Sequence, residues 1–258
     1  MTRFKVVIPA RYGATRLPGK PLRLLAGKPM IQHVFDRAVE SGAEEVVIAT
    51  DDDRIRDAAE KFGARVCMTS QHHGSGTERL SEVASKLKYP ADAIVVNLQG
   101  DEPLLPPALI RQVADDLGAH TTASISTLCT PLTHSSQIFD PNIVKVVMDQ
   151  AGYALYFSRA PIPWDRERFA SRPAQVDGFA DYFRHIGLYA YSCGFMREYV
   201  DRAPSRLEQL ESLEQLRALW YGYRIHVAHA VVETVAGVDT EEDLLRVEAL
   251  LRRQAEKI

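Results

Sequence analysis

An α/β fold with a mostly parallel central sheet and helices on both faces is the fold class that this sequence predicts. In the first half of the chain, short β-branched runs alternate with stretches whose apolar residues recur at helical spacing. These runs are nearly continuous in apolar character, as is typical of parallel strands buried on both faces. No internal repeat, linker or low-complexity tract interrupts the 258 residues, so we expect residues 1–258 to form a single domain.

The stretch after Pro29 illustrates the helical pattern. Proline suits the first turn of a helix, Ile31 and Val34 fall on one face, and Gly42 stands where the helix is expected to end. The aspartates at 51–53 are suited to cap a second helix. We expect strands at 5–9, 45–49, 65–68 and 93–98, and further helices around 80–87 and at 107–117.

The second half of the chain is less regular. Residues 161–181 are rich in Pro, Arg and Asp and show no clear period, so we expect an excursion at about 160–185 that projects toward a partner subunit. Thr240 and Asp243 form a capping box before a final helix. Strands are expected at 124–128, 144–148, 154–158, 186–191 and 231–235, with a helix at 212–220.

Charge and cysteine content exclude several classes of protein. The 31 Lys and Arg against 34 Asp and Glu leave a formal charge of −3, which is not typical of a basic nucleic-acid groove. Cys67, Cys129 and Cys193 are isolated, which disfavours a disulfide framework or a cysteine zinc site and fits a reducing compartment. No signal peptide or spanning segment is evident. We expect a soluble cytoplasmic protein that binds neither nucleic acid nor membranes.

The loop after the first expected strand combines glycines with basic residues. It runs from Pro9 to Pro21 as PARYGATRLPGKP, and loops at the carboxyl ends of parallel strands line the ligand crevice. Its backbone N–H groups with Arg11, Arg16 and Lys20 are suited to surround a triphosphate. The glycine spacing is not that of a Walker P-loop, and Pro21 replaces the hydroxyl residue of that motif. A solvated turn is the alternative.

Two aspartates are expected at the same edge of the sheet. Asp101 follows a buried strand within NLQGDEP, and Asp239 lies between a late strand and the final helix. Carboxylates opposite a basic loop suit a Mg²⁺–nucleotide site, because Mg²⁺ prefers oxygen ligands and neutralises phosphate charge. As alternatives, Asp101 caps a turn and Asp239 complements the dipole of the final helix.

Two further regions carry polar side chains suited to a ligand. The stretch HHGSGTER at 72–79 has small residues that allow a nucleotide to approach, and Arg79 begins a helix. Its histidines lack a partner at zinc spacing, and no G-x-S-x-G elbow makes Ser75 a nucleophile. Segments 182–189 and 213–216 carry hydrogen-bond donors and acceptors suited to a polyhydroxylated acid. These are the side chains of His185, Tyr189, Glu214 and Gln215. A structural histidine and a solvated helix surface are the alternatives there.

These stretches together carry a resemblance to a known family. The chain closely resembles 3-deoxy-manno-octulosonate cytidylyltransferase, also called CMP-Kdo synthetase, and the first motif alone indicates only a sugar nucleotidyltransferase. The matching stretches, in chain order, are IPARYGATRLPGKPL (8–22), HHGSGTERLSEV (72–83), VVNLQGDEP (95–103), ALYFSRAPIPW (154–164), YFRHIGLYAY (182–191), LESLEQLRAL (210–219) and GVDTEEDL (237–244).

The resemblance implies a Rossmann-like nucleotidyltransferase fold and a homodimeric cytoplasmic enzyme of lipopolysaccharide synthesis. Such an enzyme couples CTP and Kdo with Mg²⁺ and releases pyrophosphate. By motif, Asp101 and Asp239 would bind Mg²⁺, and the residues near the reacting groups would be Lys20, Arg11, Arg159 and Asp101. The nucleotide is expected against Pro9, Ala10, Arg11, Arg16, Lys20, Gly74, Ser75 and Gly76. The sugar acid is expected against Arg79, Gln99, His185, Tyr189, Glu214 and Gln215.

Two departures from the family pattern bear on the substrate. Glu78 stands where the S-G-T-D-R stretch has Asp, and Phe183 with Ser192-Cys193 replaces Tyr and Arg-Ala around R-H-I-G. Neither removes an expected ligand, but the choice between Kdo and its 8-amino analogue stays open. The alternatives are a CTP transferase for sialic acid and a non-catalytic nucleotide-binding protein.

Overall fold

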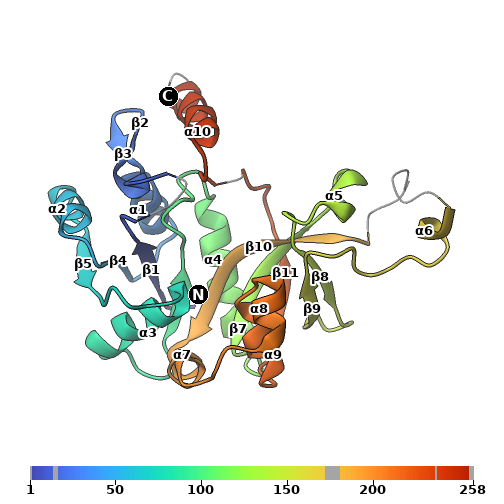
Figure 1. Ribbon diagram of the computed structural model, residues 1–258. Helices are drawn as coiled ribbons and strands as arrows, with labels where there is room; N and C mark the ends of the chain where they lie inside the picture. The colour runs from blue at the N-terminus through green and yellow to red at the C-terminus, as the bar shows by residue number, and fades with distance from the viewer. Residues whose placement is uncertain (1, 14–16, 172–180, 236, 256–258) are drawn as a thin grey trace.

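In the computed structural model, which describes residues 2–13, 17–171, 181–235 and 237–255, a nine-stranded sheet forms the centre of the molecule (Figure 1). Its main path has the order β11-β7-β10-β6-β1-β4-β5. Within this path β10 runs antiparallel to its neighbours and the other pairs are parallel. The strands of the path are β1 (Phe4–Ala10), β4 (Glu45–Thr50), β5 (Arg65–Met68), β6 (Ile94–Asn97), β7 (Ile125–Pro131), β10 (Phe183–Ser192) and β11 (Ile225–His229).

Helices cover both faces of this sheet because its strands are apolar on both sides. In β1, Val6 and Ile8 pack with α1, α2 and α4 on one face, whereas Val7 packs with α3, α7 and α9 on the other. The predicted fold class, α/β with a mostly parallel sheet, is therefore confirmed. The helices are η1 (Lys20–Leu22), α1 (Met30–Glu40), α2 (Asp53–Lys61), α3 (Gly76–Lys86), α4 (Pro107–Ala119), α5 (Ser136–Phe139), α6 (Arg168–Ser171), α7 (Cys193–Val200), α8 (Arg206–Glu211), α9 (Gln215–Trp220) and α10 (Glu241–Ala255).

The order of the strands creates a crevice beside β1. The chain passes from β1 to β4 and β5 on one side and then returns to place β6 on the other side. The connections after β1 and β6 therefore leave the sheet in different directions, and in open α/β sheets the ligand site lies at such a switch point. The basic loop after β1 and the Asp101 loop after β6 flank this point.

The last helix crosses back to the start of the chain. In α10, Leu244, Val247 and Leu251 pack against Leu17, Leu25 and Met30, near the short strands β2 (Leu24–Leu25) and β3 (Lys28–Pro29). The Val238 N–H donates to the Asp101 carbonyl oxygen at 2.9 Å, just before this helix. Packing of α10 thus brings the segment with Asp239 beside the loop after β6.

The structure corrects three details of the predicted second half. The strand predicted at 231–235 is wrong: the strand is β11, which pairs in parallel with β7, and Val231 beyond it is 65% exposed. The helix predicted at 212–220 starts only at Gln215, as α9, because Ser212 has a left-handed φ of 53° and ends the preceding helix α8, which was not predicted. Helix α7, capped by Ser192, was not predicted because it follows β10 without a turn.

The expected excursion leaves the body of the molecule beside a hairpin. Strands β8 (Lys145–Met148) and β9 (Ala154–Ser158) form this hairpin, and β8 joins β10. In Figure 1 the chain runs outward from β9 to α6. The part of the expected excursion at 172–180 lies outside the described residues. Within the described parts of the chain, no helix combines the length and apolar composition that crossing a membrane requires.

Gly100 allows the loop after β6 to approach β1 closely. A Cβ at this position would lie 2.9 Å from the Pro9 carbonyl oxygen and 3.4 Å from Cδ1 of Ile31, whereas a Cβ at Gly13 would meet nothing within 4 Å. We expect Gly100→Ala to lower the free energy of unfolding by about 1–3 kcal/mol, because backbone must move. Gly13→Ala should change it by less than about 0.5 kcal/mol. Urea denaturation of both variants checks this, and equal losses would contradict it.

Candidate active site

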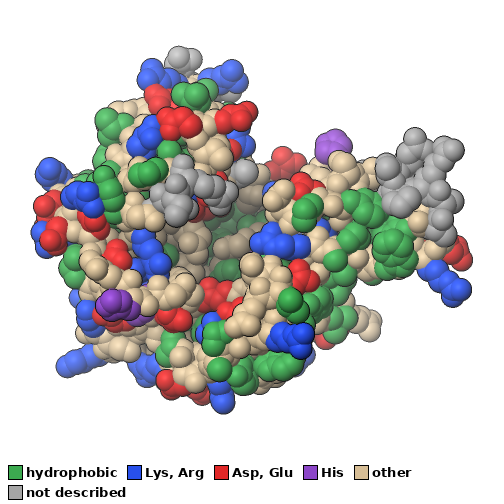
Figure 2. Space-filling view, in the orientation of Figure 1, with side chains coloured by type: hydrophobic (Ala, Val, Ile, Leu, Met, Phe, Trp, Pro, Cys, Tyr) green, Lys and Arg blue, Asp and Glu red, His purple; other side chains and the backbone are tan. Residues whose placement is uncertain are grey.

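A cleft of about 270 Å³ opens at the carboxyl ends of β1 and β6. The face drawn in Figure 2 is hollowed at its centre, and acidic and basic side chains lie around the hollow. The loop after β1, the start of η1, the start of α3 and the loop after β6 form the walls of the cleft. The lining residues are Pro9, Ala10, Arg11, Gly13, Lys20, Pro21, Gly76, Arg79, Gln99, Gly100 and Asp101.

Lys20 joins the two expected aspartates at this cleft. Its ammonium donates to Asp101 Oδ2 at 2.7 Å, to the Val238 carbonyl oxygen at 2.7 Å and to Asp239 Oδ1 at 3.1 Å. Burial alone would lower the pKa of Lys20, but the charges and hydrogen bonds of Asp101 and Asp239 raise it above 10.5. The side chain therefore stays charged at neutral pH, and the carboxylates converge on one cationic group.

The two carboxylates fit a divalent cation. Asp101 and Asp239 both reach one ammonium group, and their side chains are 33% and 54% exposed, so solvent and a metal ion have access to them. The neighbouring Glu102 has a pKa raised to about 7, through burial and then through the negative charges of Asp101 and Asp239. This concentration of hard oxygen donors and negative charge matches the preference of Mg²⁺.

Other lining residues of the cleft offer groups that suit phosphate or carboxylate. The exposed Arg11 donates to the His73 carbonyl oxygen. Arg79 is fully buried, pairs with Asp51 at 3.1 Å and donates to Thr69, yet its Nε has no hydrogen-bond partner among the described residues. Helix α3 begins at Gly76, and a helix N-terminus favours anions through its free N–H groups and dipole. The cleft therefore brings cationic groups and carboxylates together.

Comparison with known proteins identifies the family of the chain. The family model described as cytidylyltransferase matches residues 5–225. A 3-deoxy-manno-octulosonate cytidylyltransferase from Idiomarina loihiensis is 60% identical over 247 residues, which cover 96% of this chain and 98% of that protein. This chain belongs to the 3-deoxy-manno-octulosonate cytidylyltransferase family.

Other known proteins also resemble this chain in sequence and in structure. A 3-deoxy-manno-octulosonate cytidylyltransferase from Aeromonas hydrophila is 59% identical over 252 residues, 96% of this chain and 98% of the relative. The solved structure of a CMP:2-keto-3-deoxy-manno-octonic acid synthetase complexed with CTP is 41% identical, with a TM-score of 0.88 and coverage of 98% and 100%. The solved structure of a nucleotidyl transferase from Methanothermobacter shares the fold, with a TM-score of 0.61. It is 15% identical, and the match covers 98% of this chain and 99% of that chain.

Most of the nucleotide-binding residues expected for this cytidylyltransferase family member meet at the cleft. Five of them line it: Pro9, Ala10, Arg11, Lys20 and Gly76. Ser75 caps α3, and its Oγ accepts from the Glu78 N–H at 3.2 Å. The Glu78 carboxylate in turn accepts from the Gly74 N–H at 2.7 Å, so this departure from the family pattern orders the loop. Arg16 lies outside the described residues.

The expected sugar-binding residues fall in three places. Arg79 and Gln99 line the main cleft. His185 lines a second hollow of about 210 Å³, and the Tyr189 ring lies 5.3 Å from its imidazole. Glu214 and Gln215 line a small cavity that Thr77 of α3 also contacts. Burial raises the pKa of Glu214, and two atoms in this cavity, Glu214 Oε1 and Gln215 Nε2, have no hydrogen-bond partner in the described structure.

Arg159 lies at the base of the projecting region instead of in the cleft. Its N–H and Nε donate to the Glu211 carboxylate and carbonyl at 2.9 and 2.8 Å, and Nη1 donates to the Pro141 carbonyl oxygen at 2.9 Å. The fully buried Lys145 donates to the Arg159 carbonyl oxygen. These bonds hold Arg159 in the framework, and its part in the reaction stays a prediction.

Sequence reasoning missed three residues beside these sites. Asp51, the ion-pair partner of Arg79, follows β4, so the rule that singled out Asp101 at the end of a strand applies to it equally. Glu102 and Arg184 line the hollow that contains His185. Both stand next to residues that were selected, and only the folded chain shows that their side chains share this hollow.

Burial makes His185 a source of pH-dependent stability. Burial lowers the pKa of His185 to about 3, and Thr127 Oγ1 lies 2.9 Å from the His185 Nε2. Between about pH 6.5 and the folded pKa, the unfolded chain binds a proton that the fold rejects, so stability falls as pH falls. Relative to His185→Gln, the wild-type should lose up to about 1.4 kcal/mol of unfolding free energy per pH unit. Urea denaturation near neutral pH and at acidic pH checks this, and parallel profiles would contradict it.

Proposed function

We propose that this chain transfers the cytidylyl group of CTP to 3-deoxy-manno-octulosonate, forming CMP-Kdo and pyrophosphate for lipopolysaccharide synthesis. The observation that carries the proposal is the meeting of Lys20 with Asp101 and Asp239 at a cleft walled by Arg11 and Arg79. Full-length relatives bear the name of this activity, and a solved relative is described as complexed with CTP.

The reaction requires positioning and charge neutralisation more than covalent chemistry by the protein. The anomeric 2-hydroxyl of the sugar acid attacks the α-phosphorus of CTP in line. One oxygen–phosphorus bond forms, the bond to the pyrophosphate oxygen breaks, and the hydroxyl proton leaves to solvent or an adjacent base. Arg11, Lys20 and the backbone of the loop after β1 hold the triphosphate and stabilise the charge that develops on its oxygens. No covalent enzyme intermediate is proposed.

Mg²⁺ is the cofactor that the donor set supports. Asp101 and Asp239 would hold it, because both present carboxylate oxygens to the same point. When bound, Mg²⁺ supplies charge neutralisation of the phosphates and lowers the pKa of an oxygen that it contacts. Lys20 keeps the two aspartates together and carries positive charge next to the triphosphate.

Two groups of residues are proposed to hold the sugar acid. Arg79, which has an unpartnered Nε, is suited to its carboxylate, with Gln99 beside it in the cleft. The hydroxyl-binding groups are proposed to come from His185 and Tyr189 of β10 and from Glu214 and Gln215 at the start of α9. Arg159 is proposed to act near the reacting groups after substrate binding, which would require its bond to the Pro141 carbonyl to break.

The active form is proposed to be a cytoplasmic homodimer that joins through the projecting region. Leu155 on β9 and Trp164 beyond it are 62% and 60% exposed, so this region offers two large apolar side chains for contact with a second subunit. Light scattering of Leu155→Glu with Trp164→Glu checks the dimer: we expect a monomer, whereas an unchanged dimer would exclude this surface.

Pyrophosphate release tests the reaction and the substrate together. Purified protein is incubated with CTP and Mg²⁺, and Kdo, its 8-amino analogue or N-acetylneuraminate is added in separate wells. We expect release with Kdo and little release with the other two acids. Preference for another acid would keep the chemistry and change the substrate. Silence in every well, with CTP binding shown by calorimetry, would favour a non-catalytic nucleotide-binding protein.

A further inference from the structure

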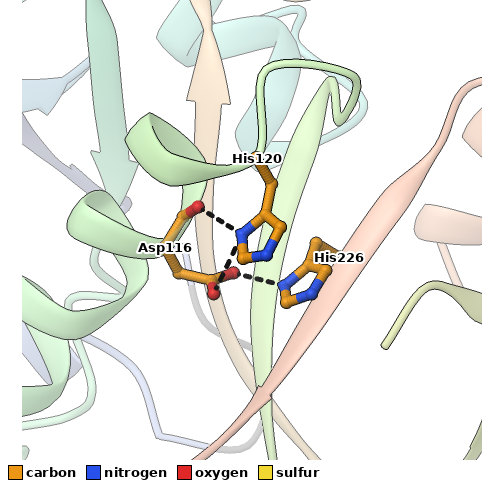
Figure 3. A group of neighbouring side chains, drawn as sticks. All are labelled: Asp116, His120 and His226. Carbon is orange, nitrogen blue, oxygen red and sulfur yellow. Dashed lines mark hydrogen bonds and ion pairs between the residues drawn. The ribbon is translucent and has the colours of Figure 1, made fainter. Parts of the chain in front are cut away.

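Asp116, His120 and His226 meet where the end of α4 lies beside β11 (Figure 3). Asp116 and His120 stand one helical turn apart at the end of α4, and His226 is the second residue of β11. Strand β11 runs parallel to β7, and β7 runs in the same direction as β6 because both are antiparallel to β10. The cleft lies at the carboxyl ends of β1 and β6, so this cluster at the amino end of β11 is separate from it.

Both imidazoles present Nδ1 to the same carboxylate. His226 Nδ1 donates to Asp116 Oδ2 at 2.7 Å, and His120 Nδ1 lies 3.4 Å from Asp116 Oδ1 while it donates to the Asp116 carbonyl oxygen at 2.8 Å. The two rings are stacked, with centroids 3.5 Å apart and an interplanar angle of 15°. One ligand atom from each of the three residues lies within 4.8 Å of the others. Two elements thus bring three metal-ligating side chains together.

One of these separations equals that of two ligands around a tetrahedral ion. Nitrogen and oxygen ligands at about 2.0–2.1 Å from Zn²⁺ stand about 3.3–3.4 Å apart at the tetrahedral angle. The 3.4 Å from His120 Nδ1 to Asp116 Oδ1 has this length, whereas His226 Nδ1 bonds the other oxygen, Oδ2, at 2.7 Å and would have to move away from it to bind an ion. Imidazole nitrogen with one carboxylate suits zinc, nickel and cobalt better than Mg²⁺.

The surroundings support the same interpretation. Ser126 of β7 donates to Asp116 Oδ2 and orients the carboxylate, as outer hydrogen bonds do in metal sites. The Tyr153 ring packs its edge against both histidines. The His226 and Asp116 side chains are 9% and 11% exposed, whereas His120 is 34% exposed, so an ion has an open approach on one side.

We propose that Asp116, His120 and His226 form a site for a divalent transition-metal ion such as Zn²⁺, with water as a fourth ligand. The bound ion would join the end of α4 to β11 and so stabilise that end of the sheet. It would not touch the substrates of the proposed reaction, because the cleft lies at the other end of the strands. Spacing rules based on cysteine pairs do not detect it, since His226 is 106 residues after His120.

Metal titration of the purified chain tests this site. EDTA-treated protein is titrated with Zn²⁺ by calorimetry, and with Co²⁺ by visible absorption, in excess Mg²⁺ so that Asp101 and Asp239 do not contribute. We expect one equivalent of Zn²⁺, a Co²⁺ spectrum typical of four coordination, and a rise in Tm of several degrees at a large excess over Kd. His120→Ala and Asp116→Asn should each weaken binding at least tenfold.

His134→Ala is the matched control, because His134 is exposed and lies outside the cluster. It should bind Zn²⁺ as the wild-type does. We expect His120→Ala to fold because His120 is half-exposed, and Asp116→Asn to fold because asparagine keeps the shape of the side chain. The Tm of each variant without metal checks that it is folded. The proposal would be overturned if the wild-type bound no equivalent of Zn²⁺ saturably, or if both cluster variants bound Zn²⁺ as the wild-type does. If both cluster variants still bound one equivalent of Zn²⁺ and replacement of a buried cysteine abolished that binding, the zinc would be assigned to a thiol.

Discussion

Asp101→Asn is expected to lower kcat by about a thousandfold or more, while Tm stays within a few degrees of the wild-type. Asparagine keeps the shape of the side chain but removes the charge that a cation at the cleft requires, a loss of several kcal/mol in transition-state stabilisation. The fold should persist because Lys20 retains its bonds to Val238 and Asp239. Removing one of three neighbouring acidic groups also relieves repulsion felt by Glu102.

The measurement is the rate of pyrophosphate release over a range of Mg²⁺ concentrations. Asp201→Asn is a suitable control, because Asp201 is an exposed aspartate at the end of α7. It should retain the wild-type rate and Mg²⁺ dependence. Near-native kcat in Asp101→Asn would refute the assignment of Asp101 as a metal ligand, whatever the control does.

Lys20→Ala is expected to lower kcat by about a hundredfold or more, with a smaller change in KM for CTP. Bonds to Asp101, Val238 and Asp239 hold the ammonium group at the cleft where the triphosphate is proposed to bind, and a preorganised charge of this kind acts mainly on the transition state. A change in KM alone would mean that Lys20 contributes equally to ground-state and transition-state binding. Steady-state kinetics with CTP varied at saturating Kdo separates these two results.

The same variant should also change how Mg²⁺ affects stability. Without the ammonium, Asp101 and Asp239 face each other with no cation between them, so apo Lys20→Ala should melt below the wild-type. Mg²⁺ should then raise its Tm more than it raises that of the wild-type, where Lys20 competes for the carboxylates. An equal response of both proteins would contradict a shared position for Lys20 and the cation.

Local pattern was enough for most of the fold. After a charged first residue, Lys5 or Glu45, the runs at 6–9 and 46–49 are apolar at every position, as is typical of strands buried on both faces, and the helix after Pro29 shows its periodicity clearly. The prediction failed at 231–235, where apolar side chains stand just after a strand and are exposed. The composition of an apolar run does not show whether it pairs with another strand. The segment at 225–229 forms β11 because it pairs with β7.

The cleft was predictable as a set of loops but not as an arrangement of side chains. Position after an expected strand singled out Asp101 and Asp239, and the basic loop after the first expected strand singled out Lys20. The sequence did not indicate that Lys20 donates to both carboxylates, nor that Arg79 is buried against Asp51. Arg159 is the converse case, since its motif predicts a place near the reaction and the structure binds it to Glu211 and Pro141.

By itself, the sequence determined the fold class, the family and the residue types of the cleft, because these depend on local periodicity and on motifs read along the chain. The tertiary structure alone decided which distant residues meet. Asp239 reaches Lys20 only because α10 packs over Leu25 and Met30, and His226 reaches Asp116 only because β11 lies beside β7. Such contacts join residues more than a hundred positions apart, and long-range packing, which local sequence does not encode, brings them together.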